Sequence, residues 1–344
     1  MRVLVIDEGF MSGAYAALGL HAHGCAVDVL AAVGGRARCL ATGGEWQFVP
    51  RVGTSALAAV LDASTRNGGY DVVYPATEPL QQLLHATPPA FRDKRVMSAL
   101  MKSAGIAVPA EHPAETDDDV RAAGHALGLP LVIKGSVGRG GNATFIVRSI
   151  AAAQRVARRM RARGGEVFAQ EHIAGVTYLA GGVFDDGRAI RLYCGAKRVQ
   201  FPARTGPAAE LESSSDPALV ETALRVFAAA RVTGLASADF LRAADGRYYF
   251  VELNPRPWGS ITAARDAGVD LFGPLVALWR GQTLPPELQF RPTVVSPVFP
   301  FALLAVPCWR SGAALRALGS RPVREPKLMA HIAHRLMRAS RTML

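Results

Sequence analysis

One stretch of this 344-residue chain limits its possible folds more than any other. A strand-like run that begins near Tyr248 carries Glu252, Asn254 and Arg256 at alternate positions. Because side chains alternate between the two faces of a strand, these three polar groups are predicted to share one side. Such a side suits a hard cation and the phosphates that it bridges. An ordinary strand that ends in a proline-rich turn is the alternative.

A second acidic residue lies upstream in a similar apolar setting. Asp239 follows the run Leu235-Ala-Ser-Ala and precedes Phe240. Two carboxylates on neighbouring strands, followed by an amide and a guanidinium, predict a site for a magnesium–nucleotide complex.

A glycine-rich loop provides a second candidate for phosphate binding. The buried run Leu129 to Ile133 ends at Lys134, and the loop that follows contains Gly138, Gly140 and Gly141. Glycines let backbone N–H groups approach phosphate oxygens closely, and the lysine would add a point charge. The loop joins strand to strand and lacks the Gly-Lys-Ser/Thr of a Walker loop. A plain glycine-rich hairpin is the alternative.

The overall composition is that of a globular protein. Half of the residues are hydrophobic and 19% are charged. The apolar run at 294–309 is interrupted by three prolines, so we expect no membrane span, and the first apolar run is too short for a signal peptide. Four cysteines without metal-site spacing predict reduced thiols and a cytoplasmic protein.

The net charge of +11 is concentrated near the end of the chain. From Arg310 onwards there are eight Lys or Arg residues and one acid, Glu325. This segment shows no helix-turn-helix, zinc finger or aromatic RNA-binding platform, so no specific nucleic-acid partner is predicted. A solvated face of a closing helix, a homodimer contact or the binding of an acidic partner remain open.

The first part of the chain alternates strands and helices, which predicts a parallel sheet. The turn after its first strand, Asp7 to Gly13, lacks the G-x-G-x-x-G spacing, so an NAD-dependent dehydrogenase is disfavoured. Farther along, Thr116 precedes three aspartates and predicts a capped helix up to Leu127. A hairpin is predicted around 185–187, and the basic, turn-rich segment 197–207 is a candidate lid or substrate loop.

The order of these motifs resembles the ATP-grasp superfamily, in particular its carboxylate–amine ligase-like and carbamoyl-phosphate-synthase-like branch. The resemblance covers about residues 1–285. It implies an α/β fold in which an N-terminal parallel-sheet pre-grasp domain precedes two α+β ATP-grasp subdomains and a short helical C-terminal extension. The expected boundaries are 1–90 for the pre-grasp domain, 91–170 for the small subdomain, 171–288 for the large subdomain with the metal site, and 289–344 for the basic extension.

The resemblance implies that two lysines contact the phosphates of ATP. These are Lys94 and Lys134, and the latter is also expected to stabilise the charge that develops during phosphoryl transfer. The loop that would close over the phosphates contains Gly138, Gly140 and Gly141.

The resemblance also places an adenine-binding hinge at Glu171 and Ile173. Gln170 belongs to the same hinge, at a position where many relatives carry an acid. Thr177 stands where many relatives carry an acid that binds the ribose, so the ribose-binding residue stays open.

The metal ligands implied by the resemblance are Asp239, Glu252 and Asn254. They are expected to bind Mg²⁺, with two ions in the site and Mn²⁺ as a possible substitute. Arg256 and Arg198 are expected to stabilise the transferred phosphate as catalytic cations.

Four further residues are candidates for substrate binding: Glu78, Arg204, Gly259 and Ser260. Each of them has a plain loop role as its alternative.

The implied activity is that of an ATP-dependent ligase. It would join a small-molecule carboxylate and an amine, with amino acids as candidates for both, through an acyl phosphate and release ADP and phosphate. Two alternatives stay open. One is another ATP-grasp reaction, such as carboxyphosphate formation or phosphorylation without ligation, and the other is non-catalytic nucleotide or polyanion binding.

Overall fold

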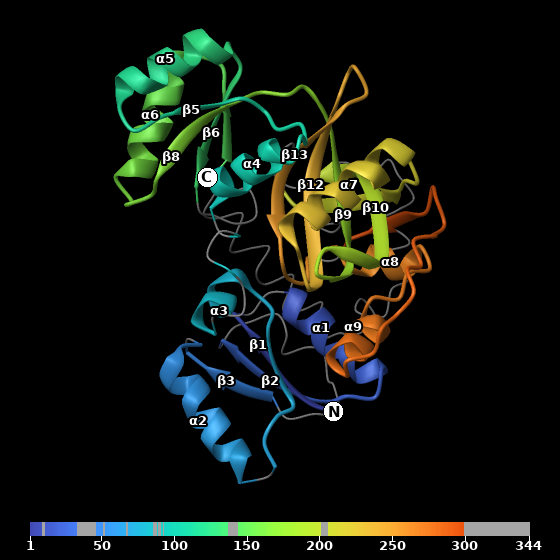
Figure 1. Ribbon diagram of the computed structural model, residues 1–344. Coiled ribbons are helices and arrows are strands. Elements are labelled where there is room, and N and C mark those ends of the chain that lie inside the picture. Colours follow the sequence, from blue (N-terminus) through green and yellow to red (C-terminus); the bar gives the residue numbers. More distant parts are fainter. Residues whose placement is uncertain are drawn as a thin grey trace.

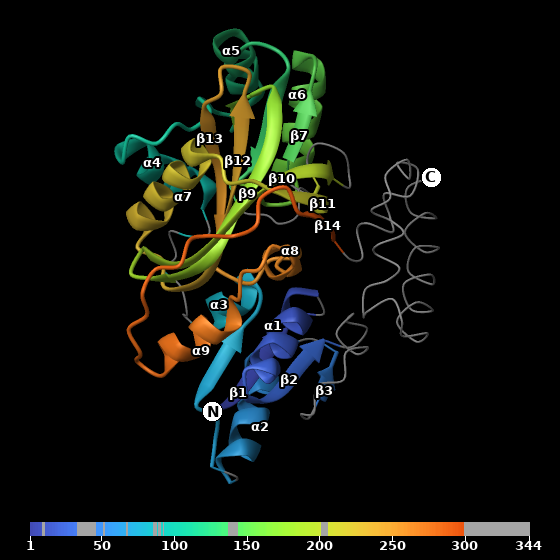
Figure 2. The same cartoon turned by 90° about the vertical axis from the view of Figure 1, so that its right-hand side faces the viewer.

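The computed structural model describes residues 1–8, 11–32, 46–50, 52–66, 68–84, 88, 91, 93–136, 144–200 and 206–298. Within these ranges the chain forms three β-sheets. Figures 1 and 2 show the N-terminal sheet at one end of the molecule, a small sheet covered by helices at the other, and the sheet of six strands between them. No helix in the described ranges has the length and apolar character needed to cross a membrane.

The N-terminal sheet is parallel, as the alternation of strands and helices predicts, and its strand order is β3-β2-β1-β4. Its first strand carries the apolar run Val3–Ile6 fully buried between layers, which explains its uninterrupted hydrophobicity. The elements are β1 (Arg2–Asp7), α1 (Met11–Ala22), β2 (Ala26–Ala32), β3 (Trp46–Val49), α2 (Thr54–Thr65), β4 (Val72–Pro75) and α3 (Glu78–Leu83).

The small sheet is antiparallel, with the strand order β5-β8-β6-β7. One of its faces packs against α5 and α6, through residues such as Leu131, Ile133 and Ala169. Strand alternation therefore sends the next residue of each strand, Lys134 among them, to the opposite face. The elements of this part are α4 (Lys94–Ser103), β5 (Glu111–Pro113), α5 (Asp117–Leu127), β6 (Leu131–Gly135), β7 (Thr144–Val147), α6 (Ile150–Arg161) and β8 (Val167–Glu171).

The six-stranded sheet has the order β13-β12-β9-β10-β11-β14. Its predicted hairpin is confirmed: Asp186 and Gly187, between β9 and β10, have φ values of 47° and 83°, as a two-residue turn requires. The elements are β9 (Gly175–Asp185), β10 (Arg188–Gln200), β11 (Ala208–Ser213), α7 (Pro217–Ala230), β12 (Gly234–Ala243), β13 (Tyr248–Asn254), α8 (Thr262–Asp266), α9 (Phe272–Trp279) and β14 (Val295–Pro297).

Two segments of this sheet differ from the sequence-based expectation. The start of the candidate lid at 197–207 is not a loop, because β10 continues to Gln200 and pairs with β11. The strand β14 lies within the expected C-terminal extension but pairs with β11, so the sheet extends past residue 288. The remainder of the expected helical extension, residues 299–344, lies outside the described residues.

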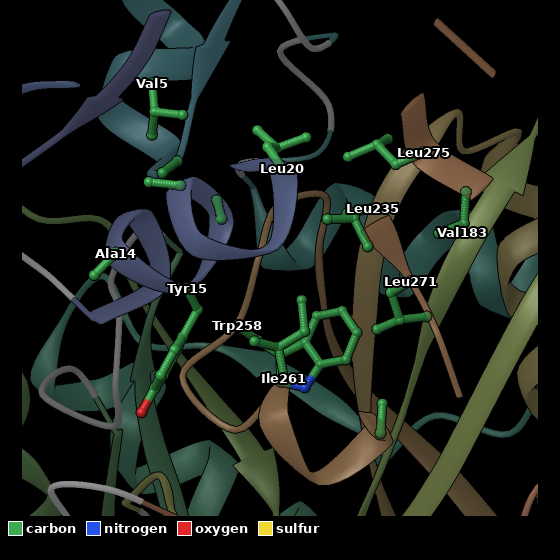
Figure 3. Packing of buried hydrophobic residues seen from close by; sticks show 14 of the residues in the cluster. Val5, Ala14, Tyr15, Leu20, Val183, Leu235, Trp258, Ile261, Leu271 and Leu275 are labelled. Carbon is green, nitrogen blue, oxygen red and sulfur yellow. The ribbon is translucent and has the colours of Figure 1, made fainter. Parts of the chain in front are cut away.

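The N-terminal sheet and the six-stranded sheet share one hydrophobic core. Figure 3 shows Tyr15 and Leu20 of α1 in one cluster with Trp258, Leu271 and Leu275. The contact between α1 and α9 is close because Gly19 has no side chain, and a Cβ there would overlap the ring of Phe272. This shared core fixes the ends of β1 and β4 next to the end of β13.

The N-terminus of α5 generates a testable stability prediction. The Thr116 hydroxyl accepts the Asp119 N–H at 3.0 Å, and the Asp119 carboxylate accepts the Thr116 N–H at 2.8 Å, which completes the expected cap as a capping box. Thr116→Ala is expected to lower the free energy of unfolding by about 1 kcal/mol in chemical denaturation. Thr116→Ser is the control and should retain most of that stability, whereas an equal loss in both variants would argue against the hydroxyl.

Candidate active site

Two carboxylates lie directly opposite each other on β12 and β13. Asp239 pairs in register with Glu252, and Ser237 pairs with Asn254, so these side chains share one face of the sheet. The Asn254 amide donates to Glu252 Oε1 at 3.5 Å and accepts from Arg256 Nη2 at 3.1 Å. The alternation predicted from the sequence thus produces a connected row of carboxylate, amide and guanidinium.

Buried cations face this pair of acids. Lys197 Nζ lies 2.5 Å from Asp239 Oδ2, with 6% and 17% of the two side chains exposed. Lys134 is 5% exposed and interacts electrostatically with Glu252, Asp239 and the neighbouring Lys94. Lysines are almost never this buried unless acids or a ligand compensate their charge, so the cluster is built around electrostatics.

The two carboxylates differ in acidity. Burial raises the pKa of the Asp239 carboxyl, and the adjacent Lys197 ammonium only partly opposes this effect. Burial also raises the pKa of Glu252, but attraction to Lys94, Lys197, Lys134 and Arg256 outweighs it and holds that pKa below its ordinary value. Glu252 is therefore the more acidic partner, and it provides the firmest negative charge for a cation.

Arg256 connects the pair of carboxylates to the N-terminal sheet. Its Nε lies 2.6 Å from Oε1 of Glu78, the first residue of α3, and both side chains are largely buried. A second link joins the Gln81 amide to the backbone oxygen of Pro255. The ion pair and this hydrogen bond hold the end of β13 against the carboxyl end of β4, the edge where parallel sheets commonly bind ligands.

The structure places Lys197, and not Arg198, against the carboxylates. Because β10 is a strand here, Lys197 and Arg198 point to opposite sides, and Arg198 forms an exposed ion pair with Glu212 at 3.0 Å. The strand therefore places Arg198 away from the carboxylates, and the role expected for it at the transferred phosphate stays a prediction. The sequence offered no clear signal for Lys197, because β10 shows no regular alternation and its pairing shifts register near Ala189 and after Lys197.

The predicted hinge lies where β8 leaves the small sheet. Gln170 is 3% exposed, and its amide donates to Glu111 Oε1 at 2.9 Å. The Glu171 N–H donates to the Ala110 carbonyl oxygen at 2.8 Å, and the Glu171 carboxylate accepts from the Ala110 N–H at 3.2 Å. Ile173 follows in the connection to β9, with its side chain partly exposed. Glu111 was not among the sequence candidates, because the three residues of β5 carry no periodic pattern.

The other expected site residues are only partly within the described ranges. Glu78 contacts Arg256, while Gly259 and the buried Ser260 form the turn between β13 and α8. Four candidates lie outside the described residues, and they are Gly138, Gly140, Gly141 and Arg204.

The chemistry of these residues fits a metal–polyphosphate ligand. Asp239, Glu252 and Asn254 offer the oxygen donors that Mg²⁺ prefers. Among the described residues, no group of three or more His, Cys, Asp or Glu side chains is suited to hold a metal by itself. Two carboxylates with an amide suffice where the ligand's own phosphates complete the coordination of Mg²⁺, and the surrounding lysines suit those phosphates.

Comparison with known proteins supplies the family. Residues 93–286 match the family model described as carbamoyl-phosphate synthase L chain, ATP binding domain. The chain belongs to this family. The match covers more than half of the chain and includes Lys94, Lys134, Asp239 and Glu252, so the ATP-grasp family predicted from the sequence is confirmed.

Two solved structures share the ATP-grasp fold with this protein. Carboxyaminoimidazole ribonucleotide synthase from Aspergillus clavatus, complexed with ATP, has a TM-score of 0.69 and 15% identity, covering 89% of this chain and 85% of that chain. The L-amino acid ligase from Bacillus licheniformis has a TM-score of 0.62 and 16% identity, covering 80% of this chain and 73% of that chain. The predicted α/β fold class is confirmed by this likeness.

A curated relative is more similar in sequence but much longer. Pyruvate carboxylase from Schizosaccharomyces pombe (strain 972 / ATCC 24843) is 27% identical over 212 residues, which are 56% of this chain. The ATP-grasp protein described here spans only 18% of the length of that relative.

The positions of Lys197 and Arg198 predict unequal effects of substituting them. Lys197→Met keeps the apolar stem but leaves Asp239 without its ammonium partner, and we expect a loss of about 10²-fold in nucleotide turnover. Arg198→Met removes an exposed ion pair and should cost much less. ADP release at saturating metal would measure both variants, and a larger loss for Arg198→Met would reverse the assignment.

Burial lowers the pKa of Lys134 to about 8, although Glu252 opposes that shift, and this value predicts a pH-dependent affinity for nucleotides. Below pH 8 the side chain is charged, and a bound polyphosphate stabilises that form further. The affinity should therefore be full below about pH 8 and fall by up to about tenfold per pH unit above it.

Calorimetric titration with ADP in the absence of metal ions would measure this dependence. Lys134→Ala should bind ADP more weakly at neutral pH and show no such decrease at higher pH. Unchanged ADP affinity in that variant would remove Lys134 from the phosphate site.

Proposed function

We propose that this protein is an ATP-dependent ligase that joins a carboxylate to an amine through an acyl phosphate and releases ADP and phosphate. The observation that carries the proposal is the buried pair Asp239–Glu252, opposed by the cations Lys134, Lys197 and Arg256. Two acids at directly opposed strand positions repel each other, and a bound cation would offset that repulsion.

In this proposal different residues bind different parts of the magnesium–ATP complex. Lys94 and Lys134 would contact the phosphates, and Asp239, Glu252 and Asn254 would hold Mg²⁺. Two metal ions are expected, with Mn²⁺ as a possible substitute. The bound metal would supply positive charge to the β- and γ-phosphate oxygens.

The reaction is expected to take place in two steps. An oxygen of the carboxylate substrate first bonds to the γ-phosphorus, and the bond to the β–γ bridging oxygen breaks, which yields ADP and an acyl phosphate. The amine nitrogen then bonds to the acyl carbon, phosphate leaves with the acyl C–O bond pair, and the nitrogen loses a proton. Arg256 and Lys197 are placed to stabilise charge on the transferred group, because both are buried beside the acids.

The two substrates would meet between the end of β13 and the N-terminal sheet. Glu78 lies against Arg256 there, and Oε2 of Glu78 is a buried oxygen without a hydrogen-bond partner among the described residues. The backbone and hydroxyl of Gly259 and Ser260 are further candidate contacts, as is Arg204 outside the described part. The amine substrate would donate a hydrogen bond to this carboxylate oxygen.

A second candidate function is carboxylation of an amine through carboxyphosphate, with bicarbonate as the carboxylate. It is favoured by the names of two proteins that this chain resembles, a pyruvate carboxylase and a carboxyaminoimidazole ribonucleotide synthase. Both candidate reactions need the same first step on ATP, so the cation and acid cluster serves either one. The L-amino acid ligase fold favours the first candidate, with amino acids as substrates.

Location and partners are further parts of the proposal. A cytoplasmic location is supported by Cys25 and Cys194, which are buried free thiols. A homodimer or an acidic partner bound by the basic segment 289–344 stays a prediction, because most of that segment lies outside the described residues.

The activity can be tested by ADP release with Mg-ATP in the presence of pooled carboxylic acids, amino acids or bicarbonate. Amine-dependent ADP release with a new amide product would support the ligase, and bicarbonate-dependent release the carboxylase. Glu252→Gln is expected to abolish turnover in either case without unfolding the protein, because it removes the more acidic metal-facing charge.

The matched control is Glu221→Gln, which makes the same change on the exposed surface of α7 and should keep the parental rate. Thermal melting of both variants would confirm that they fold. Full activity of Glu252→Gln would refute the metal assignment.

A further inference from the structure

A chain of polar side chains runs from α4 through β5 to β8. The Ser98 hydroxyl donates to Glu111 Oε1 at 2.8 Å, and Nε2 of the Gln170 amide donates to the same oxygen at 2.9 Å. Ser98 and Gln170 are 5% and 3% exposed. Buried polar groups of this kind fix one another's orientation, because each lost partner would leave a costly unsatisfied atom.

This chain of side chains lies on the face of the small sheet that carries Lys134. Glu111 pairs in register with Gln170, and Lys134 pairs with Phe168, two residues before Gln170 on the same strand. Residues two apart on a strand share a face, so Gln170 and Lys134 lie on one side of the sheet. The other side is filled by the apolar contacts with α5 and α6. Gln170 therefore belongs to the same surface as the proposed phosphate-binding lysine.

Glu111 determines which end of the Gln170 amide is left for a ligand. An ionised carboxylate only accepts hydrogen bonds, so it must face the NH₂ group of the amide. A flipped Gln170 would place its carbonyl oxygen against the carboxylate, which repels it. The amide oxygen of Gln170 is consequently turned elsewhere, and no donor in the described part of the chain bonds to it. A nearly buried acceptor without a donor is a binding feature.

The connection after β8 offers complementary groups. The N–H and carboxylate of Glu171 are engaged by Ala110, whereas the backbone of residues 172–174 makes no hydrogen bond within the described part of the chain. A fixed acceptor beside unpaired peptide groups can read one edge of a planar base. The 6-amino group of adenine would donate to the Gln170 oxygen, but the 6-oxo group of guanine would oppose it with a second acceptor.

We propose that Glu111 is a positioning residue that sets base specificity: by holding Gln170 with its oxygen free, it makes the nucleotide site select 6-amino over 6-oxo purines. This inference rests on the proposed function, since it takes the nucleotide to lie beside Lys134. Glu111 acts through Gln170 and needs no contact with the base itself.

The test compares dissociation constants for ADP and GDP, measured by calorimetry with Mg²⁺ present. Glu111 also interacts electrostatically with Lys134, so single affinities would mix two effects. The ratio of GDP to ADP dissociation constants removes that mixture, because both ligands carry the same diphosphate. In Glu111→Gln the amide of Gln170 can rotate to donate to the 6-oxo group, and the ratio should fall by about tenfold or more.

An exchanged double variant provides the rescue. In Glu111→Gln/Gln170→Glu the carboxylate stands at 170, where it can only accept, and the amide at 111 can donate to it, so the preference for ADP should return. Glu115→Gln, an exposed change on the segment between β5 and α5, is the matched control. If Glu111→Gln is unstable in thermal melting, Gln170→Met in the parental chain should show the same loss of selectivity.

An unchanged ratio of dissociation constants in Glu111→Gln would overturn the inference. If Glu111→Gln is unstable, an unchanged ratio in Gln170→Met would do so instead. A lowered ratio that the double variant does not restore would also overturn it. Absence of binding of both nucleotides to the parental protein would overturn the inference together with the proposed function. Selective ADP binding without any ligase or carboxylase turnover would reject the proposed function alone.

Discussion

The structure depends on keeping two carboxylates at directly opposed positions of adjacent strands. Asp239 and Glu252 face each other across β12 and β13, where like charges destabilise a sheet. Lys197 of β10, Lys134 of β6 and Arg256, just after β13, offset that repulsion, and each of them is itself largely buried. Burying several charges together seldom adds stability compared with apolar packing. The arrangement is therefore best understood as one that serves a charged ligand.

The rest of the fold keeps these charges in place. The core shared by α1, α9 and the six-stranded sheet fixes the N-terminal sheet next to the end of β13, where Glu78 reaches Arg256. On the other side, α5 and α6 fill the outer face of the small sheet, which leaves Lys134 and Gln170 on the inner face. Three sheets thus contribute groups to one site, and each sheet is stabilised mainly by apolar packing away from that site.

Local patterns explain which parts were predictable. Period-two alternation identified β13 and the shared side of Glu252, Asn254 and Arg256, and the capping residue Thr116 located the start of α5. Basic and turn-forming residues predicted a loop over 197–207, but the first four of these residues belong to β10, which pairs with β11. That pairing is a long-range effect. It places Lys197 against the carboxylates and Arg198 on the other side of the strand, since neighbouring residues of a strand face opposite sides.

The sequence by itself determined the type of elements, the family and most of the acids and lysines of the site, because these depend on residue identity, spacing and order along the chain. The tertiary structure alone decided which charged and polar groups meet. Lys197 with Asp239, Arg256 with Glu78, and Glu111 with Gln170 are separated by between 42 and 178 positions in the chain. Their contacts arise from strand register and from the packing of separate sheets, and neither leaves a local signal in the sequence.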